Sequence, residues 1–185
     1  MLMLIATVSA CTSSKRKEEE VAALRNSYAP VQDMEIVVSG GVNLYQYSER
    51  LTDALLKFKN SEDGCKQAAA KFEDQNQKAL AAGVCQHLGT AMDAYISAKE
   101  FFGDTHKTDL DPFTDENMFG EKTYEDLRNR FPGLEEIQVG IDYSSTPSLQ
   151  LGKFYWRGDM LQALWRLANR ERQTAKSQMD QLSQM

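Results

Sequence analysis

The stretch LYQYSERLTDALLKFK, residues 44–59, decides the fold class. Its large apolar side chains recur at steps of three and four residues, and charged side chains occupy many of the positions between them. This spacing places the apolar groups on one face of an α-helix. The positions are Leu44, Tyr47, Leu51, Leu55 and Phe58. A helix with one apolar face must bury that face against another element, so the segment predicts helix-on-helix packing.

Three other segments show the same period. One begins near Lys15 and is expected to end at Pro30, because proline restricts the residue before it. Another runs from Val84 to Phe102, and the last follows Pro147 and a candidate cap at Ser148. The sequence therefore predicts an all-α fold, an antiparallel bundle of about four helices. Gly40-Gly41 is expected to break a helix or to allow close helix contact.

The composition fits a single globular domain, which we place at residues 15–185. The chain has 185 residues, 42% of them hydrophobic, and a net charge of −6. This length matches one domain of about 100–200 residues. The acidic balance argues against nucleic acid as a partner, because binding to phosphates usually requires a basic patch.

An acidic insert, residues 104–147, interrupts the helical pattern before the last helix. It carries eleven acidic residues against four basic ones, whereas residues 153–185 carry six basic against three acidic. We expect the insert to be mostly irregular and to lie on the last helix through opposite charges. A short helix is expected from Thr123 to Phe131, stopped by Pro132-Gly133. Residues 134–143 alternate at period two, which fits either a strand or an irregular connection.

The apolar segment at residues 1–10 precedes a cysteine. Ten helical residues span about 15 Å, half the thickness of the hydrocarbon layer, so the segment cannot cross a membrane. It is typical of a secretory signal, although no Lys or Arg precedes it and truncation of the signal stays open. The alternative is a buried N-terminal segment in which Cys11 is an ordinary core residue.

The run Val8-Ser9-Ala10-Cys11 resembles the lipobox of bacterial lipoproteins. That resemblance implies lipidation of Cys11 through a thioether, cleavage just before it and acylation of the new N-terminus, with residues 11–14 as anchor and tether. Thr12 resembles the pattern that directs lipoproteins to the outer membrane. The body of the chain is only vaguely similar to uncharacterised bacterial helical proteins, through Gly41-Val42-Asn43 and the residues that follow it, and no function is carried over from them.

The two other cysteines, Cys65 and Cys85, form an even pair in a chain expected to be exported. A disulfide between them requires the chain to fold back, because 20 residues of unbroken helix span about 30 Å. Gly83 and the Glu62-Asp63-Gly64 turn are the expected breaks. The rival interpretation is two separate thiols on one long helix through residues 65–102.

Signatures of catalysis and of cofactor or metal binding are missing from the sequence. No nucleophile elbow, phosphate loop, dinucleotide fingerprint, HExxH or CxxCH motif occurs. The cysteines lack metal-ligand spacing, His87 is isolated, and a calcium loop starting at Asp109 lacks the required glycine and glutamate. We expect no enzyme, no cofactor and no metal. The aromatic run Phe154-Tyr155-Trp156 fits either a ligand pocket or core packing.

These observations predict a noncatalytic protein of the cell envelope. It would be held on the membrane by a lipid on Cys11, at the periplasmic face of the outer membrane, and would present an interaction surface to an envelope protein. The alternative hypothesis is a binding module that holds a small apolar or metal ligand inside the bundle.

Overall fold

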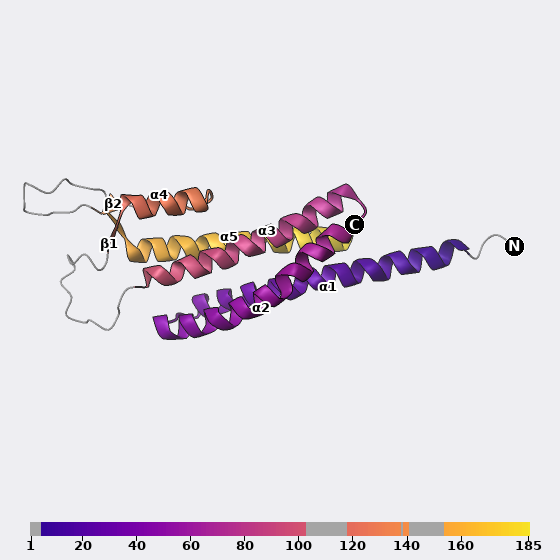
Figure 1. Ribbon diagram of the computed structural model, residues 1–185, viewed down its shortest axis with the longest axis horizontal. Helices are drawn as coiled ribbons and strands as arrows, with labels where there is room; N and C mark the ends of the chain where they lie inside the picture. Colours follow the sequence, from indigo (N-terminus) through magenta and orange to yellow (C-terminus); the bar gives the residue numbers. More distant parts are fainter. Residues whose placement is uncertain (1–4, 103–117, 138, 141–153) are drawn as a thin grey trace, which may run out of the picture.

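The computed structural model describes residues 5–102, 118–137, 139–140 and 154–185, and confirms the all-α class. In these ranges four long helices form a bundle (Figure 1). They are α1 (Ile5–Ser39), α2 (Leu44–Lys71), α3 (Gln75–Ala98) and α5 (Arg157–Gln184). α1 packs mainly against α2, and α3 mainly against α5.

Contacts between side chains fix the directions of the helices. The Ser27 hydroxyl of α1 donates to the Ser61 carbonyl of α2 at 3.0 Å, whereas Arg16, earlier in α1, contacts Glu73, beyond the end of α2. In the same way Gly83 of α3 lies against Gln178 of α5, and Glu100 beyond α3 contacts Arg157. Early residues of one helix therefore meet late residues of its neighbour, so α1 and α2 run in opposite directions, as do α3 and α5.

α1 passes through Pro30 without ending, so the boundary expected there is wrong. Proline removes one backbone donor and strains the preceding turn, at a cost of about 3 kcal/mol in a helix interior. Here Pro30 is buried, and Val31 and Met34 after it are 0% exposed. Burial of this continued apolar face outweighs the local cost, and α1 ends only at Ser39.

The turn between α1 and α2 lies at Gly40-Gly41, where the sequence indicated a break. Gly41 has a φ of 76°, in the left-handed region that a residue without Cβ adopts easily. Asn43 then begins α2 with a capping box, because its side chain accepts from the Gln46 amide at 2.9 Å and the Gln46 side chain accepts from the Asn43 amide.

The turn between α2 and α3 lies at residues 72–74, not at Gly83 or at Glu62-Asp63-Gly64, which are inside helices. Asp74 starts α3 by accepting from the amides of Asn76 and Gln77, each at 2.9 Å. Phe72, 4% exposed, fills the space below the turn. The continuous helix through residues 65–102 is therefore also excluded. We call this end of the bundle, with the last turn of α5, the base end.

The core is built from the apolar faces that the periodicity predicted. Buried side chains from all four long helices form it, and small residues of α3 and α5 let these two helices approach closely. Its fully buried members include Leu24, Tyr47, Val84, Leu88, Ala91, Ala163, Leu164 and Leu182.

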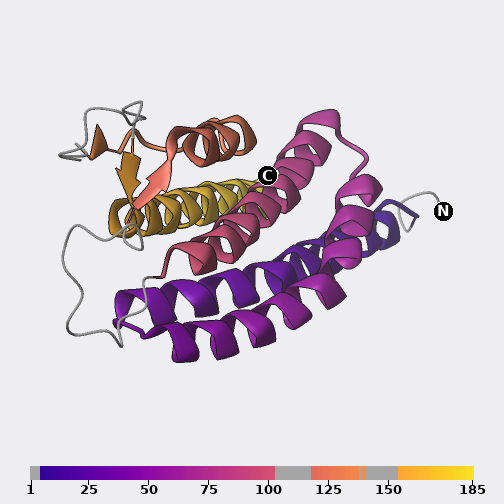
Figure 2. The ribbon, with the colours of Figure 1, turned by 60° about the vertical axis from the view of Figure 1, so that its left-hand side comes forward.

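A small module covers the opposite end, which we call the sheet end. Three short strands pair antiparallel in the order β1-β3-β2, and α4 follows β1. Their bounds are β1 (Met118–Gly120), α4 (Glu121–Arg130), β2 (Val139–Gly140) and β3 (Phe154–Trp156), and a 3-10 turn, η1 (Lys99–Phe101), follows α3. This sheet module lies on the side of α3 and α5 away from α1 and α2 (Figures 1 and 2).

The module corrects two expectations. The described part of the insert contains a helix and two short strands, and the short helix begins two residues earlier than expected. The last helix begins at Arg157 rather than at Ser148, because residues 154–156 form the central strand of the sheet. Pro147 and Ser148 lie outside the described residues.

Candidate functional site

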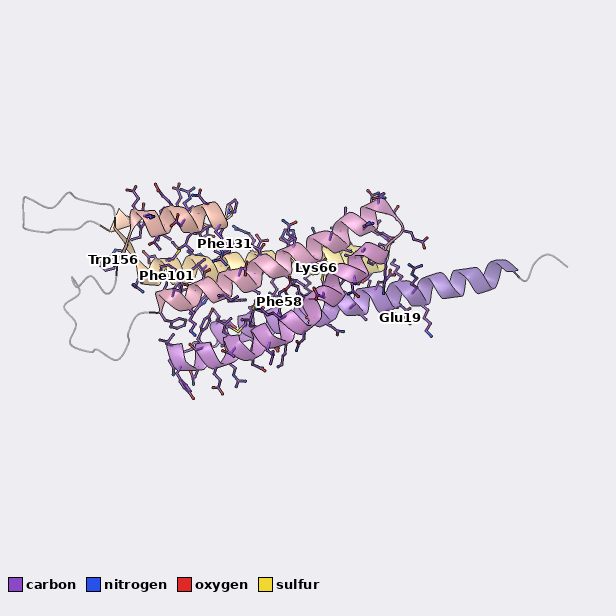
Figure 3. The ribbon with its side chains drawn as sticks, viewed as in Figure 1. Glu19, Phe58, Lys66, Phe101, Phe131 and Trp156 are labelled. Atoms are coloured by element: carbon purple, nitrogen blue, oxygen red, sulfur yellow. A yellow bond between two sulfur atoms is a disulfide. The ribbon has the colours of Figure 1, made fainter. Side chains whose placement is uncertain are left out.

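The lipidation candidate, Cys11, belongs by its backbone to the first part of α1, and its side chain lies outside the described residues. This part of α1 projects beyond the base end of the bundle (Figure 1). Figure 3 shows Glu19 near the point where α1 leaves the other helices. The segment that resembles a lipobox is thus carried on this projecting part of α1.

Arg16 fixes the position where α1 joins the base end. Its guanidinium lies 3.2 Å from Glu20 and 3.2 Å from Glu73, and also donates to the Lys71 carbonyl. The Glu20 side chain is only 8% exposed, so this carboxylate is held by a nearby cation rather than by water. Arg16 and Glu20 are four residues apart on α1, and the contact with Glu73 extends this pair to the α2–α3 turn.

Cys65 and Cys85 form a disulfide between α2 and α3, with Cα atoms 6.0 Å apart. The even pair of cysteines suggested this bridge, and the turn at residues 72–74 makes it geometrically attainable. Cys65 is 1% exposed, whereas Cys85 is partly exposed. The bridge therefore has a buried sulfur on α2 and a more accessible one on α3.

Beside the disulfide, α2 and α3 form an open groove of about 490 Å³. This volume falls in the range of about 300–1,000 Å³ of small-molecule sites. Five of its lining residues are small: Ala69, Ala70, Ala82, Cys85 and Gly89. Glu62, Lys66 and Lys78 also line it, and Lys66 is bound to Glu62 at 2.6 Å.

A polar cluster joins α1 to α5 inside the bundle. Arg172, 8% exposed, lies 2.8 Å from the Glu35 carboxylate and donates to Asn169 at 3.0 Å and to the Tyr28 hydroxyl. Its Nε is buried without a hydrogen-bond partner. Removing the Glu35 charge would leave a buried cation uncompensated, so this cluster restricts how α1 and α5 can pack.

Two buried tyrosines link α2, α3 and α5 nearer the sheet end. The Tyr47 hydroxyl donates to the Tyr95 carbonyl at 2.7 Å and accepts from Trp165 at 3.4 Å. Burial raises the pKa of both hydroxyls above the ordinary 10.0, and for Tyr95 the nearby Glu35 carboxylate raises the pKa further. Both groups stay protonated near neutral pH, so Tyr47 acts as a hydrogen-bond donor.

His87 of α3 contacts the Glu171 carboxylate of α5 at 2.6 Å, with both side chains partly exposed. The described residues contain no group of three or more histidine, cysteine, aspartate or glutamate side chains within reach of one metal ion. Asp109, which the sequence raised as the start of a calcium loop, lies outside those residues.

The aromatic run forms the central strand of the sheet module. Tyr155 is 4% exposed and stacks on Tyr124, with ring centroids 4.0 Å apart, while Trp156 is 37% exposed. The module meets α5 through charged groups, as the opposite charges of the two segments predicted. Glu135 lies 2.7 Å from Arg166, and Arg170 donates to the Gly133 carbonyl.

Sequence reasoning missed the groove and the Arg172 cluster. The groove had a signal, because small residues recur at helical spacing in α2 and in α3, but the register that places the two series side by side depends on the turn at residues 72–74. In the sequence, Arg172 is one of six basic residues in and near the last helix, and nothing local distinguishes it from the others. Only the packing of α1 against α5 makes it a buried group.

Among the described helices, none is both long and apolar enough to span a membrane. Comparison with known proteins adds no relative: no family model matches the chain, no curated protein matches it and no solved structure matches it.

Proposed function

We propose that this protein is a noncatalytic, lipid-anchored component of the bacterial cell envelope that presents an interaction surface to another envelope protein. One observation carries the proposal: the run Val8-Ser9-Ala10-Cys11, which resembles a lipobox, lies on the part of α1 that projects beyond the bundle (Figure 1). A modifying enzyme and a peptidase need such access to the backbone. The Cys65–Cys85 disulfide supports the same compartment, because disulfides persist in oxidising spaces.

The anchor would fix how the bundle stands on the membrane. Cys11 precedes Arg16 by five residues, about 7.5 Å of helix, so the base end would lie close to the lipid headgroups. The sheet module lies at the other end. α2 alone has 28 residues and extends about 42 Å, so the sheet module would face away from the membrane.

The sheet module is the surface we assign to the partner. The side chain of Trp156 is partly exposed on this module. Its helix α4 buries Tyr124 and Leu127 and presents charged side chains on its other faces. Tryptophan and arginine are enriched where proteins bind one another. The acidic character of the insert favours a partner with a basic surface, at the periplasmic face of the outer membrane.

The anchor is tested by expressing the full gene in a Gram-negative host and measuring intact mass, membrane fractionation and free thiols without reductant. We expect a lipid-sized gain in mass, recovery with the membranes and no free thiol. Cys11→Ala is the control and should stay unmodified and soluble, with the disulfide intact. A wild-type protein that stays unmodified with three titratable thiols would refute both the anchor and export.

The partner surface is tested by placing a photoreactive amino acid at Trp156 or, as a matched control, at the exposed Lys176 of α5. Irradiation of cells should give a discrete cross-linked envelope protein from position 156 and none from position 176. Equal cross-linking from both positions, or none from position 156, would count against the sheet module as the interaction surface.

A further inference from the structure

The groove between α2 and α3 has no role in an envelope anchor or in the sheet module. It lies on the half of α2 and α3 nearer the base end, between residues 62–70 of one helix and 78–90 of the other. Figure 3 shows Lys66 in this half of the bundle. The α3 side extends over about 18 Å of helix axis, which gives the groove an elongated form.

The surface of the groove is apolar, and many of the residues that line it have short side chains. Ala69 is 5% exposed and forms part of the floor, while Ala70 and Ala82 face outward from their helices. A Cβ added to Gly89 would meet nothing within 4 Å, so the space above this residue is open. A narrow apolar chain could lie along this floor in van der Waals contact, and burial of its methylene groups would favour binding.

The charges along the groove are not balanced. Lys66 is neutralised by Glu62 at 2.6 Å, but the exposed Lys78 has no ion pair among the contacts of the described residues. The nearest acidic residue along the helix, Asp74, uses its carboxylate to cap α3 by accepting from the amides of Asn76 and Gln77. Asp74 keeps its negative charge as a cap but is not among the residues that line the groove, so Lys78 leaves one positive charge among the lining side chains, at the end of the groove nearer the base.

A second groove, between α1 and α2, provides a comparison. It has about 380 Å³ and is lined by two acidic and two basic side chains, Asp33, Asp53, Arg50 and Lys57, of which Asp53 and Lys57 are paired at 2.8 Å. This groove has no excess charge and would not distinguish an anion from a cation. Of these two grooves, the α2–α3 groove is the one that combines an apolar floor with a residual positive charge.

We propose that the α2–α3 groove binds a single-chain anionic amphiphile, with the alkyl chain along Ala69, Ala82 and Gly89 and the anionic head group at Lys78. The site is independent of the lipid on Cys11. The proposal narrows the alternative hypothesis of a bound apolar ligand to one class of ligand. It places that ligand in a groove on the surface of the bundle and not inside the bundle. Carboxylate and phosphate head groups share the required charge.

The test measures binding of dodecanoate, below its micelle concentration, to the full chain carrying Cys11→Ala, by titration calorimetry. We expect saturable binding of one dodecanoate per chain, weaker binding of decanoate and octanoate by up to about fourfold per methylene group removed, and no comparable binding of dodecyltrimethylammonium. Dodecyl phosphate in place of dodecanoate distinguishes the two head groups. Equal binding of the cationic amphiphile, or no binding of either anion, would overturn the proposal.

Two variants locate the site. Lys78→Gln should weaken dodecanoate binding about fivefold, as expected for one ion pair near the surface, while Lys59→Gln, an exposed lysine elsewhere on α2, should leave it unchanged. Ala82→Gln should fill the groove and reduce binding at least about tenfold, while Ala22→Gln on an exposed position of α1 should not. Circular dichroism and a thiol count verify the fold of each variant. Unchanged affinity in both groove variants would refute the site.

Other occupants would give different results. A dimer in sedimentation that dissociates in Ala82→Gln but not in Ala22→Gln would assign the groove to a second copy of the chain. Because the binding is measured on a chain without the lipid, failure to bind dodecanoate would leave the anchor proposal intact, and failure of lipidation would leave the groove proposal intact.

Discussion

The base end and the sheet end of the bundle are held together by different kinds of interaction. At the base, a disulfide links α2 to α3 and Arg16 links α1 to the turn between them. At the sheet end, strands of two or three residues and one stacked tyrosine pair hold the module together internally, and buried side chains such as Phe131 and Leu134, with exposed ion pairs, attach it to the bundle. Covalent closure restricts the unfolded chain, whereas short strands and exposed pairs contribute little each. We therefore expect the sheet module to open locally at a lower free energy than the base.

The largest expected effect is on the base. Replacing the bridge with Cys65→Ala and Cys85→Ala should lower the free energy of unfolding by about 3 kcal/mol, because the unfolded chain regains the entropy of a 20-residue loop. Urea unfolding measures the change. Wild type with reductant should show a similar loss, and hydrogen exchange should accelerate in α2 and α3 near residues 65–85 more than in α4. A loss below about 1 kcal/mol would show that the base does not depend on the bridge.

At the sheet end, Tyr124→Ala should remove the ring that stacks on Tyr155. Tyr124 is 7% exposed, so we expect a loss of about 2 kcal/mol, largely confined to the module. Hydrogen exchange in α4 and the fluorescence of Trp156 measure the local opening. Tyr45→Ala, at a residue 78% exposed, is the control and should change stability by less than about 0.5 kcal/mol. Equal protection of α4 in both variants would contradict the comparison.

Alkaline pH should weaken the helices between the two ends. Because burial raises the pKa of the Tyr47 and Tyr95 hydroxyls above 10.0, the folded protein binds more protons than the unfolded chain once the pH exceeds about 10. Their contribution is complete below that pH and decreases above it, by up to about 1.4 kcal/mol per pH unit for each tyrosine.

Urea unfolding of wild type and Tyr95→Phe at pH 8 and above pH 10 measures this slope. The variant removes one buried ionisable hydroxyl and should lose less stability than wild type between the two pH values. Tyr45→Phe, at an exposed tyrosine, should follow wild type. Parallel pH profiles for wild type and Tyr95→Phe would refute the role of burial.

The smallest effect is expected at the contact between the insert and α5. Glu135→Gln should cost at most about 1 kcal/mol, because both members of the pair with Arg166 are about half exposed. The loss should disappear at high salt, where such charges are screened. Unfolding of wild type and variant at low and high salt measures it, with Glu49→Gln as the control. A salt-independent loss would indicate a role for Glu135 other than charge.

Helical periodicity predicted the elements well where it continued without interruption. The stripe from Leu44 to Phe58 lies in α2 as expected, and the charges of the insert and the last helix predicted their contact. Boundaries were less accurate. Pro30 and Gly83 are residues that usually end helices, yet both lie inside them, because Pro30 is buried beside Val31 and Gly83 lets α3 approach Gln178 of α5.

The candidate sites also differ in how far the sequence predicted them. Cys11 was identified by a contiguous motif and stays a prediction, since its side chain is not described. The even number of remaining cysteines suggested a pair between Cys65 and Cys85. The turn at residues 72–74 brings the two cysteines close enough to form the disulfide. The α2–α3 groove could not be predicted, because its lining comes from two helices whose register no local pattern specifies.

By itself, the sequence determined the helical class, the apolar faces and the position of the lipobox-like segment, because each depends on residues close together in the chain. The tertiary structure alone decided where α2 gives way to α3, that Arg172 is buried against Glu35, and that Lys78 stands at the end of an apolar groove. These features depend on contacts between distant residues, whose combined burial outweighs local preferences of a few kcal/mol.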